Sequence, residues 1–169
     1  MFFRSTPVQP LPAGPGQESV WDYPRPAIWQ PTPKRLQVVF KGVTIADTTN
    51  GKRVLETSHP PTYYLPPEDV QPDYLEATNY QTRCEWKGRC RYFNLRVGDR
   101  LLEQAAWQYI DPTPPFQPLL DHFAFYAGPM DACYVEGEQV TPQEGRFYGG
   151  WITADVVGPF KGGPGTMGW

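Results

Sequence analysis

The 169-residue sequence lacks any run of about 18 consecutive apolar residues, so it predicts no transmembrane helix. Its start, MFFRSTPVQPLP, lacks the continuous apolar segment of a signal peptide. Basic residues are not in excess, because the formal net charge is −3 at pH 7, and non-specific nucleic-acid binding requires a concentrated basic surface. The composition therefore predicts one soluble domain with neither a membrane nor a nucleic-acid partner.

Cysteine is also scarce, and its spacing argues against a metal site. Three cysteines cannot all pair in disulfides, so we expect reduced thiols and a cytoplasmic protein. A zinc knuckle typically separates two cysteines by two to four residues, so that a tight turn aims both sulfurs at one ion. Cys84 and Cys90, in RCEWKGRC, are too far apart for that knuckle, and Cys133 and His59 would complete a ligand set only through folding. We predict no metal.

Several catalytic motifs are absent as well. The chain has no phosphate-binding G-x-x-x-x-G-K-[ST], no G-x-G-x-x-G after a strand, no Cys-x-x-Cys redox pair and no G-x-S-x-G nucleophile motif. The late GPFKGGPG resembles a phosphate cradle, but its prolines remove amide donors that a cradle needs. We therefore predict no cofactor.

Proline, glycine and aromatic residues are abundant: 21 Pro, 16 Gly, 10 Tyr, 9 Phe and 6 Trp. So much Pro and Gly leaves little room for long helices and favours short strands joined by turns. Their distribution divides the chain into an extended Pro- and aromatic-rich arm (residues 1–33), a β-rich body (34–140) and a Gly-rich tail with one strand (141–169). The predicted fold is mainly β, with antiparallel tent-like or barrel-like sheets and one short helix.

Alternating apolar residues with Gly-containing turns predict hairpins in the body. In RLQVVFKGVTIAD the chain reverses at Lys41 and Gly42, and in RYFNLRVGDRLLEQAAWQY at Gly98 and Asp99, where a leading glycine suits a type II′ turn. RVLET and TYYL predict two further strands, and DACYVEGEQV predicts a last strand that turns at its Glu-Gly pair. PFQPLLDHFAFY fits either a short helix or a strand.

Polar residues embedded in these aromatic strands are the main functional signal. If the strands converge, a carboxylate, a lysine and several rings surround one cavity, as in many ligand sites. The residues are Arg53, Glu56, Tyr63, Tyr64, Trp86, Lys87, Trp107 and Tyr109. The alternative is a surface Glu–Lys pair over a core of stacked aromatic rings.

Four motifs in one order resemble a known family: ESVWDYPRP (18–26), RVLETSHPPTYYLPPEDV (53–70), CEWKG (84–88) and AAWQYIDP (105–112). Over about residues 18–140 the chain resembles the bacterial family named domain of unknown function 427. The resemblance implies a β-tent fold, in which two antiparallel sheets meet at an angle over a pocket. Several β-tent proteins bind zinc through paired Cys-x-x-Cys knuckles, which this chain lacks. The family also carries a nucleotidyltransferase-like label, although closely spaced acidic metal ligands are not evident here.

Transferred residue by residue, the resemblance implies one pocket. Its lining is Arg53, Glu56, His59, Tyr63, Tyr64, Cys84, Trp86, Lys87, Trp107 and Tyr109. RCEWKGRC then forms a wall of the pocket, with its two cysteines as small packing residues.

Our leading hypothesis is a β protein that binds an unidentified, partly apolar small molecule; it covers both a binding protein and an enzyme. In an enzyme, Glu56 would act as general base and Lys87 as electrostatic stabiliser. The alternative is a non-catalytic interaction module that docks a partner or a second copy through its arm and tail. Nucleotidyl transfer is a third hypothesis. Either a monomer or a homodimer is compatible with the sequence.

Overall fold

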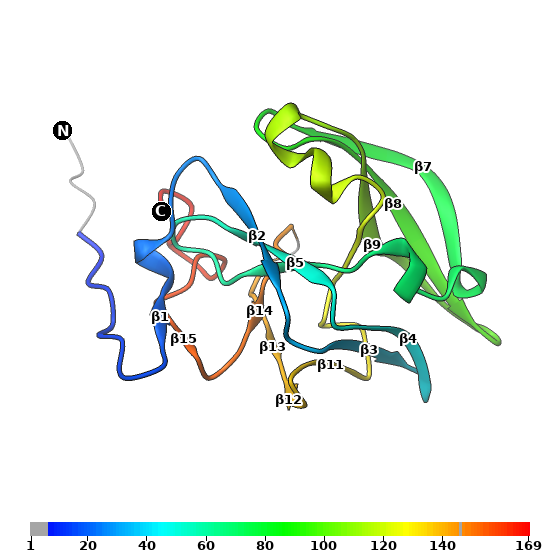
Figure 1. Ribbon diagram of the computed structural model, residues 1–169, viewed down its shortest axis with the longest axis horizontal. Helices are drawn as coiled ribbons and strands as arrows, with labels where there is room; N and C mark the ends of the chain where they lie inside the picture. Colours follow the sequence, from blue (N-terminus) through cyan, green and yellow to red (C-terminus); the bar gives the residue numbers. More distant parts are fainter. Residues whose placement is uncertain (1–6, 146) are drawn as a thin grey trace.

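A computed structural model describes residues 7–145 and 147–169 of the chain. The described residues form fifteen β-strands and four short 3-10 helices, so the fold is mainly β as predicted (Figure 1). The strands form several sheets whose pairings are antiparallel except at the chain's ends. Among these residues no sheet closes into a barrel. The first six residues of the predicted arm lie outside the described residues.

The largest sheet has the strand order β10-β9-β8-β7. Its strands are β7 (Leu75–Cys84), β8 (Gly88–Val97), β9 (Arg100–Pro112) and β10 (Phe123–Phe125). The predicted hairpin at Gly98 joins β8 to β9, and Gly98 has a φ of 56°, the sign that a type II′ turn requires. Strand β7 was not predicted: it is an edge strand with few apolar residues, so neither alternation nor hydrophobicity marks it.

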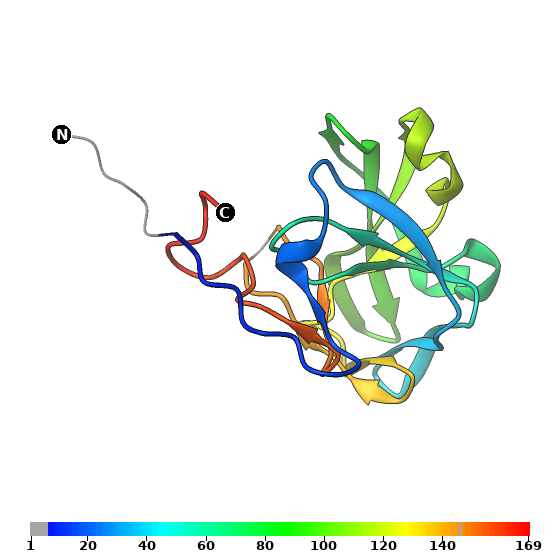
Figure 2. The ribbon, with the colours of Figure 1, turned by 60° about the vertical axis from the view of Figure 1, so that its left-hand side comes forward.

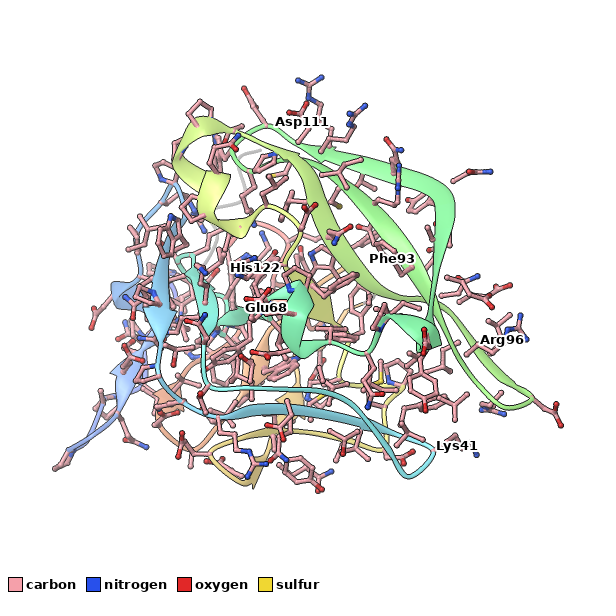
Figure 3. The ribbon with its side chains drawn as sticks, turned by 45° about the vertical axis from the view of Figure 1, so that its right-hand side comes forward. Lys41, Glu68, Phe93, Arg96, Asp111 and His122 are labelled. Atoms are coloured by element: carbon pink, nitrogen blue, oxygen red, sulfur yellow. The ribbon has the colours of Figure 1, made fainter. Side chains whose placement is uncertain are left out.

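A second sheet, of order β12-β11-β3-β4, contains two predicted hairpins. Its strands are β3 (Leu36–Phe40), β4 (Val43–Thr48), β11 (Ala132–Val135) and β12 (Glu138–Gln139). Lys41 and Gly42 turn β3 into β4, and Glu136 and Gly137 turn β11 into β12. All four residues have positive φ, as type I′ hairpin turns require. In Figure 3 Lys41 marks the tip of the first hairpin.

A three-stranded sheet contains β2 (Ile28–Thr32), β5 (Gly51–Leu55) and β6 (Thr62–Tyr64) in the order β2-β5-β6. Leu65 and Phe123 exchange backbone hydrogen bonds of 2.8 Å in both directions, which connects this sheet to β10 of the largest one. The two sheets therefore form adjoining walls, and the face between them holds the candidate site.

The first described residues, from about residue 7, and the C-terminal tail lie side by side in both Figure 1 and Figure 2. Strand β1 (Glu18–Ser19) pairs in parallel with β15 (Val156–Val157), and β13 (Thr141–Pro142) pairs with β14 (Trp151–Ile152). Further along, the indole rings of Trp21 and Trp169 pack edge to face with centroids 5.4 Å apart. Where one strand was predicted near residues 151–157, the structure has two short ones, β14 and β15, each paired with a different partner.

The 3-10 helices are η1 (Val20–Asp22), η2 (Pro67–Asp69), η3 (Pro72–Tyr74) and η4 (Pro114–Leu119). The segment PFQPLLDHFAFY contains both of its predicted alternatives in succession, since η4 is followed by β10. No helix in the described part of the chain is long and apolar enough to cross a membrane.

The main core lies between the sheets and includes the inward-facing residues of β3, as their alternation predicts: Leu36, Val38 and Phe40 are almost fully buried. Phe93 joins this core from β8 and packs edge to face on Phe123, and Figure 3 shows it inside the molecule. A second buried cluster, rich in aromatic residues, lies against the cavity described next.

Candidate functional site

A cavity of about 350 Å³ lies between the three-stranded sheet, strands β7–β9 and the C-terminal tail. This volume falls within the typical range of small-molecule sites, about 300–1,000 Å³. Eight of the ten residues predicted for the site line it: Glu56, His59, Tyr64, Cys84, Trp86, Lys87, Trp107 and Tyr109.

The other two predicted residues, Arg53 and Tyr63, do not line this cavity. They are directly paired across β5 and β6, and their side chains point to the opposite face of the sheet because neighbouring side chains alternate. There the Arg53 guanidinium donates two hydrogen bonds to the carboxylate of Glu18, at 2.7 and 3.0 Å, and two to Gln30. Arg53 thus has a partner for its charge that ties β5 to the N-terminal arm.

A tight turn brings the polar residues of the cavity together. The amide of His59 donates a 3.0 Å hydrogen bond to the carbonyl of Glu56, and Ser58, the third residue of the turn, has a φ of 73°. This is the pattern of a type II turn, which usually has glycine at that position. Because the first and last residues of a turn lie close, the turn places the side chains of Glu56 and His59 next to each other.

The Glu56 carboxylate lies between two basic side chains. One oxygen is 3.4 Å from Nε2 of His59 and the other is 3.6 Å from Nζ of Lys87, which comes from the β7–β8 hairpin. All three side chains are mostly buried, with 16–21% of each exposed. Burial lowers the pKa of His59 to about 4, so its ring is neutral at pH 7. The cavity therefore contains a neutral imidazole beside a carboxylate and an amine.

Aromatic rings form the deeper wall. Trp107 donates a 3.2 Å hydrogen bond from its indole nitrogen to the hydroxyl of Tyr64, and its ring lies 4.7 Å from that of Tyr126. Burial raises the pKa of the phenols of Tyr64, Tyr92, Tyr109 and Tyr126, so all four remain neutral at physiological pH. This wall offers flat apolar surface and uncharged hydroxyl groups.

The stretch RCEWKGRC forms the β7–β8 hairpin, as a wall of the cavity. The register pairs Cys84 with Gly88 and Thr82 with Cys90, so both thiols point to the cavity face. Neither forms a disulfide, and the Oγ1 of Thr82 lies 3.0 Å from the sulfur of Cys90. Trp86, at the tip, is 43% exposed. Within residues 7–145 and 147–169 no group of three or more His, Cys, Asp or Glu is placed to hold a metal ion.

Gly88 at the end of this hairpin is a position that only glycine fits. Its φ is 112°, and a Cβ there would lie 2.3 Å from the carbonyl oxygen of Asp111. The close approach holds the hairpin against β9 and so fixes Lys87 over the cavity.

The C-terminal tail supplies a wall that the sequence did not predict. Gln143, Tyr148, Gly149 and Lys161 line the cavity opposite β7. The backbone at Gly149 passes so close to Trp107 that a Cβ would lie 2.1 Å from the indole ring. No motif marks this contact, because it depends on how a Gly-rich segment returns across the sheet.

Residues 28–136 match a family model described as domain of unknown function 427 (DUF427). The chain belongs to this family. No curated protein matches the chain. The DUF427 segment contains every predicted site residue, including Glu56 and Lys87, whereas Gln143, Tyr148 and Lys161 follow it in the chain.

Proposed function

We propose that the cavity binds a partly apolar small molecule, with its flat part against the aromatic wall and its polar group at Glu56 and Lys87. The observation that carries this proposal is the junction of a largely buried aromatic wall with the side chains of Glu56 and Lys87, which both face the same cavity. Tyr64, Trp86 and Trp107 would stack on the ligand, as aromatic rings in recognition sites do.

The distances from the Glu56 carboxylate to its two basic neighbours leave it able to bind a ligand group as well. Charge-assisted hydrogen bonds from nitrogen to a carboxylate are typically about 2.7–2.9 Å long. The contacts of Glu56 with His59 and Lys87, at 3.4 and 3.6 Å, are longer, so its lone pairs are not saturated. In a reaction Glu56 would take a proton from the ligand, and the ammonium of Lys87 would stabilise the negative charge left behind.

The binding proposal is tested with a library of small fragment molecules of three classes: neutral aromatic compounds, aromatic acids and aromatic amines. Their binding is measured by ligand-detected NMR. Cys84→Phe fills the cavity from β7, whereas Arg83→Phe adds the same ring at the neighbouring exposed position on the opposite face. We expect fragments that bind the wild type and Arg83→Phe and are lost from Cys84→Phe. Equal binding to both variants would place the ligand elsewhere.

The role of Glu56 is tested separately by Glu56→Gln, which keeps the shape and removes the charge. We expect weaker binding of the fragments that carry a hydrogen-bond donor or a positive charge, and unchanged stacking of neutral ones. A Glu56→Gln protein that binds every fragment as the wild type does would contradict the assignment.

One observation favours a second function, docking of a partner protein. Phe147 and Met167, both in the C-terminal tail, are 86% and 92% exposed. Removing the tail does not separate the two functions, since the tail also forms a wall of the cavity. Phe147 also lines the cavity, so the single substitution Met167→Ser is the appropriate test. Loss of an association seen with the wild type, with fragment binding retained, would support docking.

A further inference from the structure

Gln143 has only one orientation of its amide group that satisfies its neighbours. The backbone N–H of Gly150 donates to its Oε1 at 3.1 Å, and its Nε2 donates to the carbonyl oxygen of Lys161 at 2.8 Å. Turning the amide over would face a donor to a donor and an acceptor to an acceptor. The residue is buried, with 6% exposed, so water does not offer an alternative.

The same amide nitrogen faces the ring of His59. Nε2 of Gln143 lies 3.1 Å from Nδ1 of His59, and an amide nitrogen can only donate. Nδ1 must therefore accept, which places the proton of the neutral ring on Nε2. Nε2 is the ring nitrogen nearer to Glu56, 3.4 Å from its carboxylate, which is longer than a normal hydrogen bond.

We propose that Gln143 is a positioning residue, which fixes the tautomer of His59 so that the ring presents its protonated Nε2, and not a lone pair, to the carboxylate of Glu56 in the cavity. The tautomer follows from the hydrogen bonds of Gln143, whereas its use beside a catalytic or binding carboxylate rests on the proposed function. Gln143 lies beyond the segment that matches the family, so this control comes from the C-terminal tail.

The protein contains an internal comparison, because its other histidine has the opposite arrangement. Nζ of Lys52 lies 2.9 Å from Nε2 of His122, and an ammonium can only donate, so Nε2 accepts. Nδ1 of His122 then carries the proton and donates to the carbonyl of Leu120 at 3.2 Å. His122, labelled in Figure 3, does not line the cavity.

Long-range ¹H–¹⁵N NMR of the full chain, labelled at its two histidines, reads both tautomers directly at pH 7. We expect two neutral rings, one protonated at Nε2 and one at Nδ1. His59→Gln assigns the signals. A wild-type His59 protonated at Nδ1 would overturn the proposal at once.

Two variants then identify which neighbour fixes the tautomer. If Gln143 does so, Gln143→Leu shifts the His59 nitrogens towards the average of both tautomers, while Glu56→Gln keeps the proton on Nε2. The opposite result, an unchanged pattern in Gln143→Leu and a changed one in Glu56→Gln, would assign the control to Glu56 and overturn the proposal. An unchanged His122 pattern shows that each variant is folded.

The measurement needs no ligand, so its outcome is independent of the fragment screen. If His59 has the expected tautomer but no fragment binds, the proposed function fails and the role of Gln143 in fixing the tautomer stands. If fragments bind but the proton of His59 is on Nδ1, the proposed function stands and the role of Gln143 fails.

Discussion

Mild acidification should destabilise this protein through His59. The ring is buried beside Glu56, and burial lowers its pKa from 6.5 to about 4 despite the attraction of that carboxylate. Three cations that surround it, Lys161, Lys87 and Arg25, lower the pKa further. Between pH 6.5 and pH 4 the unfolded chain therefore binds a proton at His59 that the folded protein does not. The contribution of the neutral His59 ring to the free energy of unfolding is therefore fully present above pH 6.5. It is lost as the pH falls from 6.5 to about 4.

The size of the effect follows from the two pKa values. With 6.5 for the unfolded chain and about 4 for the folded protein, linkage gives a loss of about 2 kcal/mol in the free energy of unfolding between pH 7 and pH 5. This loss is a substantial part of the total stability of a small domain, about 5–15 kcal/mol.

The assay is urea unfolding at pH 7, 6 and 5, followed by tryptophan fluorescence, for the wild type and His59→Gln. His122, whose pKa burial also lowers, is present in both proteins, so its contribution cancels in the comparison. The paired carboxylates Glu18, Asp47 and Asp155 have lowered pKa values and contribute mainly at lower pH. We expect the difference in stability between the two proteins to change by about 2 kcal/mol across this range. A constant difference would refute the burial argument.

Three further substitutions probe the site and its surroundings. Gly88→Ala should destabilise the protein by at least about 3 kcal/mol in urea unfolding, because it combines a positive φ with a clash against β9. Gly128→Ala, with open space around it, is the control. Equal losses of stability in the two variants would contradict the predicted clash. Tyr64→Phe should cost about 1–3 kcal/mol by leaving the buried indole N–H of Trp107 without its acceptor, and no loss would show that water replaces it. Arg53→Met should lower stability while leaving fragment affinity unchanged. A loss of fragment affinity would show that Arg53 contributes to ligand binding after all.

The hairpins of the fold could be predicted because their information is local. Period-two alternation marks the buried face of β3, and the pairs at Lys41 and Gly98 have the backbone freedom that tight turns require. Strand β7 could not be found in this way. It lies at the edge of its sheet and few of its side chains are buried, so its sequence has no apolar alternation. Among the described residues its only strand partner is β8, and that pairing becomes apparent only in the folded sheet.

Part of the site prediction could have been sharper from the sequence. Tyr63 and Tyr64 are consecutive residues of one strand, so they cannot both face one cavity, and the same alternation separates Arg53 from Val54, which does line it. The contribution of Gln143 was beyond sequence reasoning, because nothing local indicates that a segment after the matched domain returns to contact His59.

The central claim, that the aromatic cavity holds a small molecule, is tested most directly by native mass spectrometry of freshly purified protein. We predict a discrete non-covalent addition to the wild type and to Arg83→Phe that disappears on denaturation and is absent from Cys84→Phe. An addition of the same mass to all three proteins would mean that the ligand binds outside the cavity. A bare wild type that also binds none of the aromatic fragments would contradict the claim itself.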